Sequence, residues 1–226
     1  MNGFIFASGV NHHGNDSTGA FRPGAEAFKR IHDIPQPIFY FDHNDSGAKL
    51  RKKILDRLMT IPCDDPDGLD VIAYFGHGVQ NGLPSAHFYR DHVQELTAAI
   101  IATSKHEVRV ILYACQAGKL PTCFASALAT GMNTTDAAVF GHHNVGHSFA
   151  NPYVTTFDIG HVGRYVVEPG SSSWHNWSKA IRDGNAHPRT KTLWARFPFL
   201  CEDEIRAELG DFVPGSVYRP VGQFIA

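Results

Sequence analysis

The feature of this sequence that most limits its fold is an apolar segment, Val108–Tyr113, which reads VRVILY. A strand that is apolar at nearly every position has to be covered on both faces, which is typical of a central strand in a parallel sheet. Helical patterns lie on either side of it in the chain, at His92–Ser104 and at Pro121–Thr130. The segment therefore predicts an α/β fold with a mostly parallel central sheet.

The same alternation of strands and helices continues through residues 1–150. Further strands are expected at Gly3–Gly9, Pro37–Asp42, Asp70–Phe75 and Ala137–Gly141, and further helices at Pro23–His32 and Lys49–Ile61. Beyond this core we expect strands at Tyr153–Phe157 and Val162–Val167, and helices at Trp174–Asp183 and Glu202–Leu209. Because no segment reads as a linker, we expect a single domain over 1–226, with a catalytic core at 1–150 and an α+β extension at 151–226 packed on it.

Composition excludes several classes of protein. The formal net charge of the 226 residues is -2, so nothing favours nucleic-acid binding. No apolar run approaches the roughly 20 residues that span a bilayer, and the N-terminus does not resemble a signal peptide. The four cysteines form neither a zinc-ligand pair nor a disulfide framework. We therefore expect a cytoplasmic protein with reduced thiols that binds neither nucleic acid nor a membrane.

Two strand ends carry the residues of chemical interest. The third expected strand ends in Phe75-Gly76-His77-Gly78, and the fourth in Tyr113-Ala114-Cys115-Gln116. Ligands of open parallel sheets bind beyond the carboxyl ends of the strands. If the two strands are neighbours, His77 and Cys115 project into the same crevice, and the chain between them accommodates one helical crossover.

Cysteine and histidine together can perform nucleophilic catalysis. The thiolate is the nucleophile, whereas a free thiol is mostly protonated at neutral pH. A nearby imidazole can accept that proton and later donate one to a leaving amine. The amides of Gly78 and Cys115 are candidates for an oxyanion hole, in which a single donor often contributes about 3–4 kcal/mol.

These motifs resemble those of the caspase-like cysteine peptidases, the clan that contains caspases, legumains, gingipains and clostripain. Their shared pattern is an apolar strand ending in His-Gly and a second ending in Ala-Cys, followed shortly by Gly; here it is matched by His77-Gly78 and Ala114-Cys115. The resemblance implies a caspase-like three-layer sandwich, with His77 as acid and base and Cys115 as nucleophile. Gln116-Ala117 separates Cys115 from Gly118, whereas caspases have one residue there, so the motif is closer to the gingipain, clostripain and CHAT types.

The leading hypothesis is a cysteine endopeptidase that forms an acyl-enzyme on Cys115, without a metal or cofactor, and acts on a protein or peptide substrate. An alternative is a catalytically silent caspase-like module used for binding or assembly. A third is a metal hydrolase using His12, His142 and His147, although no HExxH motif accompanies them. A buried structural role is the alternative for Cys115 alone. The sequence does not determine whether the protein binds a regulatory partner or forms a homo-oligomer.

Substrate-binding residues follow from the same sheet edge. The loops after the first and fifth strands place His12, His13, Asp16, His142 and His143 there. In the peptidase clan that these motifs resemble, the residue two positions before the nucleophile helps to form the pocket for the substrate residue preceding the cut. In this sequence that position is Tyr113. A phenol stays neutral to about pH 10, so we expect no strong preference for Arg or Lys, unless Asp16 enters the pocket.

Overall fold

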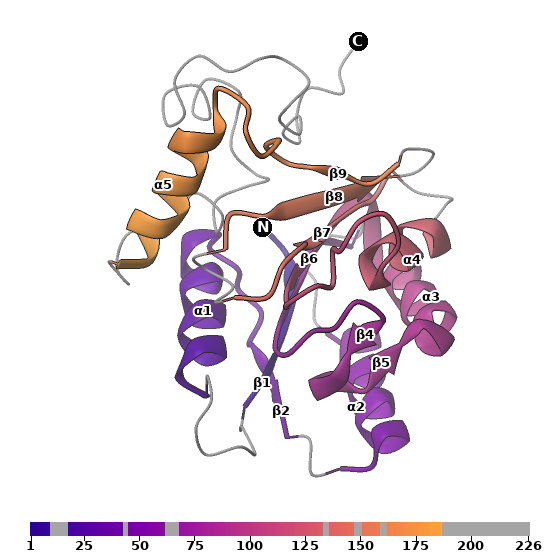
Figure 1. Ribbon diagram of the computed structural model, residues 1–226. Coiled ribbons are helices and arrows are strands. Elements are labelled where there is room, and N and C mark those ends of the chain that lie inside the picture. The colour runs from indigo at the N-terminus through magenta and orange to yellow at the C-terminus, as the bar shows by residue number, and fades with distance from the viewer. Residues whose placement is uncertain are drawn as a thin grey trace.

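The computed structural model describes residues 1–9, 18–42, 45–61, 68–132, 136–146, 151–158 and 162–186. Within these ranges a seven-stranded sheet forms the centre of the molecule, in the order β2-β1-β3-β6-β7-β8-β9 (Figure 1). Its strands are β1 (Gly3–Ser8), β2 (Phe39–Phe41), β3 (Leu69–Phe75), β6 (Ser104–Tyr113), β7 (Ala138–His142), β8 (Val154–Asp158) and β9 (Arg164–Tyr165).

The first five of these strands run parallel, and the last two are antiparallel additions at one edge. β2, β1, β3, β6 and β7 pair in parallel, while β8 pairs antiparallel with β7 and β9 with β8. The predicted mostly parallel sheet is therefore confirmed. β8 and β9, which follow residue 150, extend the same sheet rather than forming one of their own.

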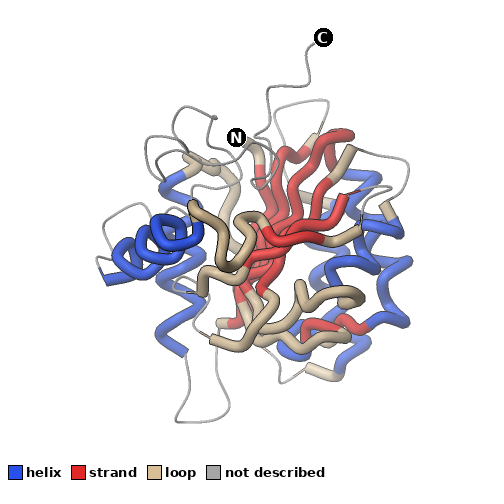
Figure 2. The backbone as a smooth tube through the Cα atoms, turned by 45° about the horizontal axis from the view of Figure 1, so that its top comes forward, coloured by secondary structure: helices blue, strands red, loops and turns tan. Residues whose placement is uncertain are grey.

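Helices cover both faces of the sheet, as Figures 1 and 2 show. They are α1 (Thr18–Ile31), α2 (Gly47–Met59), α3 (Val93–Thr103), α4 (Phe124–Gly131) and α5 (Trp174–Ala186). Alternate side chains of each strand divide the core into two clusters, as the two-residue period of a strand requires. α2, α3 and α4 pack on the cluster containing Tyr74 and Leu112, and α1 and α5 pack on the one containing Phe75 and Tyr113.

Two local features differ from the sequence prediction. Pro23 lies inside α1, which begins at Thr18, instead of opening the helix. A proline in the second turn removes a single helical hydrogen bond, and the amphipathic helix tolerates it because its apolar face is buried. A small hairpin was also missed, formed by β4 (Gly82–Leu83) and β5 (Phe88–Tyr89) between β3 and α3. Its strands are too short to show a period.

The expected helix at Glu202–Leu209 lies outside the described residues. None of the helices in the described ranges is long and apolar enough to cross a membrane.

Candidate active site

The carboxyl ends of β3 and β6 bring the two predicted catalytic side chains to one edge of the sheet. The strands are hydrogen-bonded neighbours, and their last registered pair is Phe75 with Tyr113. His77 and Cys115 each follow that pair by two residues, and the Gly76 N–H still donates to the Tyr113 carbonyl at 3.5 Å. The expectation that these two strands are adjacent is therefore met.

Beyond the strands, the turn after His77 rests directly on the backbone that carries Cys115. A β-carbon added at Gly78 would lie 2.5 Å from the Cys115 carbonyl oxygen and 2.6 Å from the Ala114 Cβ. Both distances are far shorter than any real contact of a β-carbon, so only glycine allows this approach. The His77 and Cys115 turns are thus in van der Waals contact through Gly78.

The two cysteines in the described ranges have different environments. Cys115 is half-buried, and its thiol donates to the Gly146 carbonyl with Sγ 3.4 Å from the oxygen. Cys123 is fully buried and caps α4, where its Sγ accepts the Ser126 N–H at 3.4 Å. Burial raises the pKa of the Cys123 thiol, which makes it a poor nucleophile. Cys115 is the accessible thiol of the pair.

The turn after Cys115 explains the spacing of its motif. Gln116 adopts a left-handed conformation with φ 55°, and its N–H donates to the Asn144 carbonyl at 3.4 Å. Gly118 then passes so close to β7 that an added β-carbon would lie 2.6 Å from the Gly141 carbonyl oxygen. Because this close approach falls two residues after Gln116, the glycine of the motif has to stand at position 118.

Two residues that hold this turn in place were not predicted from the sequence. They are Thr155 in β8 and Asn151 in the segment before it. The Thr155 hydroxyl is within hydrogen-bonding distance of two carbonyl oxygens, 2.6 Å from Gly118 and 3.1 Å from Gly141. Asn151 is buried, and its amide donates to the Asn144 carbonyl at 3.1 Å. Since Asn144 also accepts from Gln116, Asn151 supports the segment that reaches Cys115. A lone Asn or Thr far away in the chain gives no pattern that would have revealed this role.

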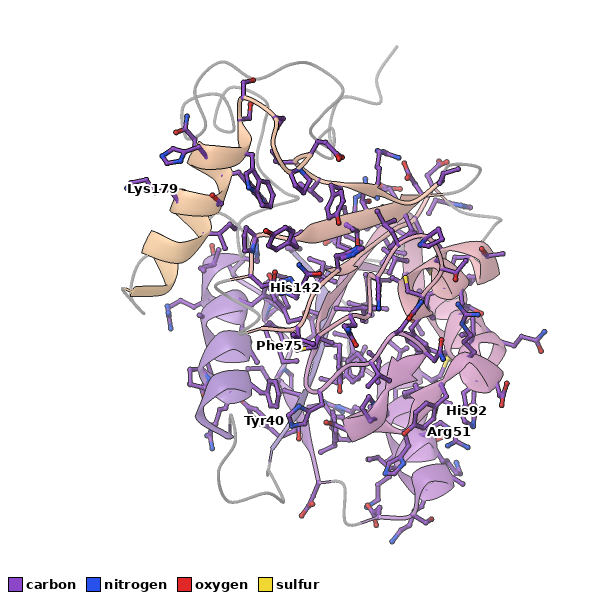
Figure 3. All side chains as sticks on the ribbon, viewed as in Figure 1. Tyr40, Arg51, Phe75, His92, His142 and Lys179 are labelled. Atoms are coloured by element: carbon purple, nitrogen blue, oxygen red, sulfur yellow. The ribbon has the colours of Figure 1, made fainter. Side chains whose placement is uncertain are left out.

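Two of the predicted substrate-binding side chains lie inside the protein. Tyr113 is fully buried and stacks on Phe75, with ring centroids 4.4 Å apart. Burial raises its pKa well above the ordinary value, so the phenol stays neutral, but it packs beneath the site. His142, labelled in Figure 3, is also fully buried, and its ring lies 6.4 Å from that of Tyr113. A pocket wall has to be reached by substrate, and neither side chain is exposed in this structure.

His12, His13 and Asp16 lie outside the described residues, as does His147 of the metal-site alternative. Over the described ranges, no group of three or more His, Cys, Asp and Glu side chains is placed to hold a metal ion. Since two of its three proposed ligands are not described, that alternative remains a hypothesis.

His143, the remaining predicted substrate-binding residue, is half-buried and has a structural contact. Its Nδ1 accepts the Leu120 N–H at 3.2 Å, which requires that nitrogen to be unprotonated. Its ring lies 5.3 Å from that of Tyr165. Burial, aided by the charge of nearby Lys119, lowers the pKa of His143 from its ordinary value near 6.5. The neutral imidazole thus links the chain after Cys115 to the end of β7.

This contact predicts a pH dependence of stability. A lowered pKa means that the unfolded state takes up a proton first as the pH falls through about 6.5, so the contribution of His143 is full above that pH and declines below it. His143→Asn retains an acceptor without a titrating group. We expect the melting temperature of the wild type to fall more between about pH 7.5 and 5.5 than that of His143→Asn.

The exposed His106, at the other end of β6, provides the control: His106→Asn should keep the wild-type pH slope. Equal slopes in wild type and His143→Asn would show that the Leu120 contact does not depend on the protonation of His143.

Comparison with protein-family models shows a similarity to a family of unknown function. Residues 43–147 match the family model described as Domain of unknown function (DUF8616). The match includes β3, β6 and β7, and with them both His77 and Cys115. No curated protein matches the chain. The similarity therefore places the candidate site inside the matched region and says nothing of its chemistry.

Proposed function

We propose that this protein is a caspase-like cysteine endopeptidase in which His77 and Cys115 form the catalytic dyad. The observation that carries the proposal is the position of both residues at the same register beyond two adjacent parallel strands, with Gly78 packed on the Cys115 backbone. Covalent catalysis requires a nucleophile and a base within hydrogen-bonding reach, and this placement brings the backbones of both residues to the same edge of the sheet. The α/β sheet with helices on both faces supports a caspase-like sandwich.

The proposed reaction begins with the thiol proton. In the resting arrangement the Cys115 thiol donates to Gly146, so the proton has to leave that carbonyl for the His77 imidazole. The thiolate then attacks the scissile carbonyl carbon, and the carbonyl electrons move to its oxygen. The N–H groups of Gly78 and Cys115 are the candidates to stabilise this oxyanion, and neither donates to another of the described residues.

Collapse of the tetrahedral intermediate breaks the carbon–nitrogen bond. The imidazolium returns its proton to the leaving amine, and a thioester remains on Cys115. Water then attacks the thioester carbonyl, with His77 accepting its proton. The second collapse releases the carboxylic acid and restores the thiol, so no metal, oxidant or cofactor enters the balance.

The proposal is tested by alkylation and chelation. Iodoacetamide should label Cys115 and abolish Cys115-dependent cleavage of a peptide library, whereas EDTA should leave cleavage unchanged. Cys115→Ala should lose both labelling and cleavage. Cys123→Ser is the matched control, because serine retains the capping role at a thiol that is not exposed, and it should keep both.

The outcome also separates the alternatives. Labelling of Cys115 without any cleavage would favour the silent binding module. Cleavage that EDTA abolishes and zinc restores would favour the metal hydrolase instead.

A further inference from the structure

We propose that Tyr74 and Ser85 are positioning residues that hold the backbone of His77 and so orient its imidazole toward Cys115. The inference rests on the proposed function and extends it to two side chains outside the dyad. Both are placed by contacts to the two main-chain polar groups of the same residue, His77.

The Tyr74 hydroxyl binds one side of this residue. It donates to the His77 carbonyl at 2.9 Å, although Tyr74 precedes His77 by only three residues. The phenol reaches back over the strand end because Gly76 has no side chain: a β-carbon there would lie 2.2 Å from the Tyr74 hydroxyl oxygen. Glycine at position 76 is therefore a requirement of the contact.

The Ser85 hydroxyl binds the other side. Its Oγ accepts the His77 N–H at 3.2 Å, and Ser85 lies in the short helical turn Pro84–Ala86 beside the β4–β5 hairpin. Ser85 also hydrogen-bonds with the phenol of Tyr74. The two hydroxyls thus bind the two peptide groups on either side of the His77 Cα, and together they form a closed network around this residue.

The network is anchored in the core, which makes it suitable for fixing a position. Tyr74 is fully buried, and its ring lies 5.0 Å from Phe6 and stacks on Phe41 at 6.4 Å. Burial raises the pKa of Tyr74 far above its ordinary value, so the phenol remains a hydrogen-bond donor throughout the working pH range. The imidazole itself packs edge-on against Phe21, with centroids 5.1 Å apart. With the backbone held on both sides and the ring against Phe21, the imidazole has little freedom to change its orientation.

Two kinds of substrate distinguish positioning from mere structural support. A peptide anilide needs a proton donated to its leaving amine, whereas 4-nitrophenyl acetate releases nitrophenolate without one. A displaced imidazole should therefore impair anilide cleavage more than acylation by the ester. A loss of folded protein would reduce both rates equally.

Tyr74→Phe should lower kcat for the anilide about tenfold while KM stays within about twofold, and slow ester acylation less than about threefold. The anilide is chosen as the best wild-type substrate among matched peptides with Arg, Asp, Leu or Asn before the bond. Ser85→Ala should behave like Tyr74→Phe, and Ser85→Thr, which keeps the hydroxyl, should restore kcat. Tyr40→Phe is the matched control: its hydroxyl binds Glu26, 3.3 Å away, and kcat should not change.

The decisive measurement is made in a variant that lacks the His77 imidazole, through which the network is proposed to act. In a His77→Ala background, Tyr74→Phe should have no further effect on residual ester acylation. A further loss there, or unchanged anilide kcat in both Tyr74→Phe and Ser85→Ala, would overturn the inference. If Tyr74→Phe does not fold, the Ser85→Ala and Ser85→Thr pair decides. A wild type without Cys115-dependent acylation would instead refute the proposed function, which distinguishes the two failures.

Discussion

Cys115→Ala and His77→Ala are each expected to reduce kcat/KM for peptide cleavage by on the order of 10⁴-fold or more, and the double variant should lose little beyond either one. In the proposed mechanism the nucleophile and its base act as a unit: without the thiol no acyl-enzyme forms, and without the imidazole neither the thiol nor the leaving amine exchanges its proton. Their joint position beyond β3 and β6 makes this coupling geometrically possible.

Folding can be separated from catalysis in the same experiment. Both side chains are half-buried, so their truncation should leave the melting temperature nearly unchanged. His106→Ala removes an exposed histidine at the opposite end of β6 and should retain full activity. Either dyad variant retaining wild-type kcat/KM would refute the assignment, and additive losses in the double variant would show that the two residues act independently.

The position of His77 and Cys115 at one edge of the sheet was predictable because it depends on short-range patterns. Apolar runs identify β3 and β6, and parallel pairing places their carboxyl ends at one edge, so residues two positions beyond each strand meet without any knowledge of loops. The alternation of strands and helices gave the sheet and its layers in the same way. These inferences need only the period of each element and the rule that parallel strands are joined by crossovers.

The supporting residues were not predictable because the turn that they support is distant in the chain. Thr155 reaches Gly118 across 37 residues, and Asn151 reaches Gln116 only through the carbonyl of Asn144, to which both donate. Tyr113 shows a different limit. In a strand that is buried on both faces, the apolar pattern does not reveal on which face the last side chain lies or how deeply it is buried. Tyr113 packs between Phe28 and Phe75 instead of facing a substrate.

Gly78→Ala is expected to reduce kcat/KM by about 100-fold or more, because it separates the His77 turn from the Cys115 turn. The added methyl would lie 2.5 Å from the Cys115 carbonyl oxygen and 2.6 Å from the Ala114 Cβ. Neither is the end of a flexible side chain, so one backbone has to move. A displacement of about 1 Å can cost on the order of 100-fold in rate, and the candidate oxyanion donor on Gly78 would move as well.

Gly9→Ala is the matched control for this substitution. It also follows a strand at this edge of the sheet, but its added methyl would meet its nearest neighbours, in β2, at an ordinary 3.4 Å. We expect Gly9→Ala to keep wild-type kinetics. We expect Gly78→Ala to remain folded, because Gly78 itself is half-buried and outside the two core clusters, and only Ala114 of the core lies against the new methyl. Alkylation of Cys115 by iodoacetamide should persist in Gly78→Ala, since the thiol remains accessible, while peptide cleavage fails. Wild-type cleavage by Gly78→Ala would show that close contact between the His77 turn and the Cys115 turn is not needed for the reaction.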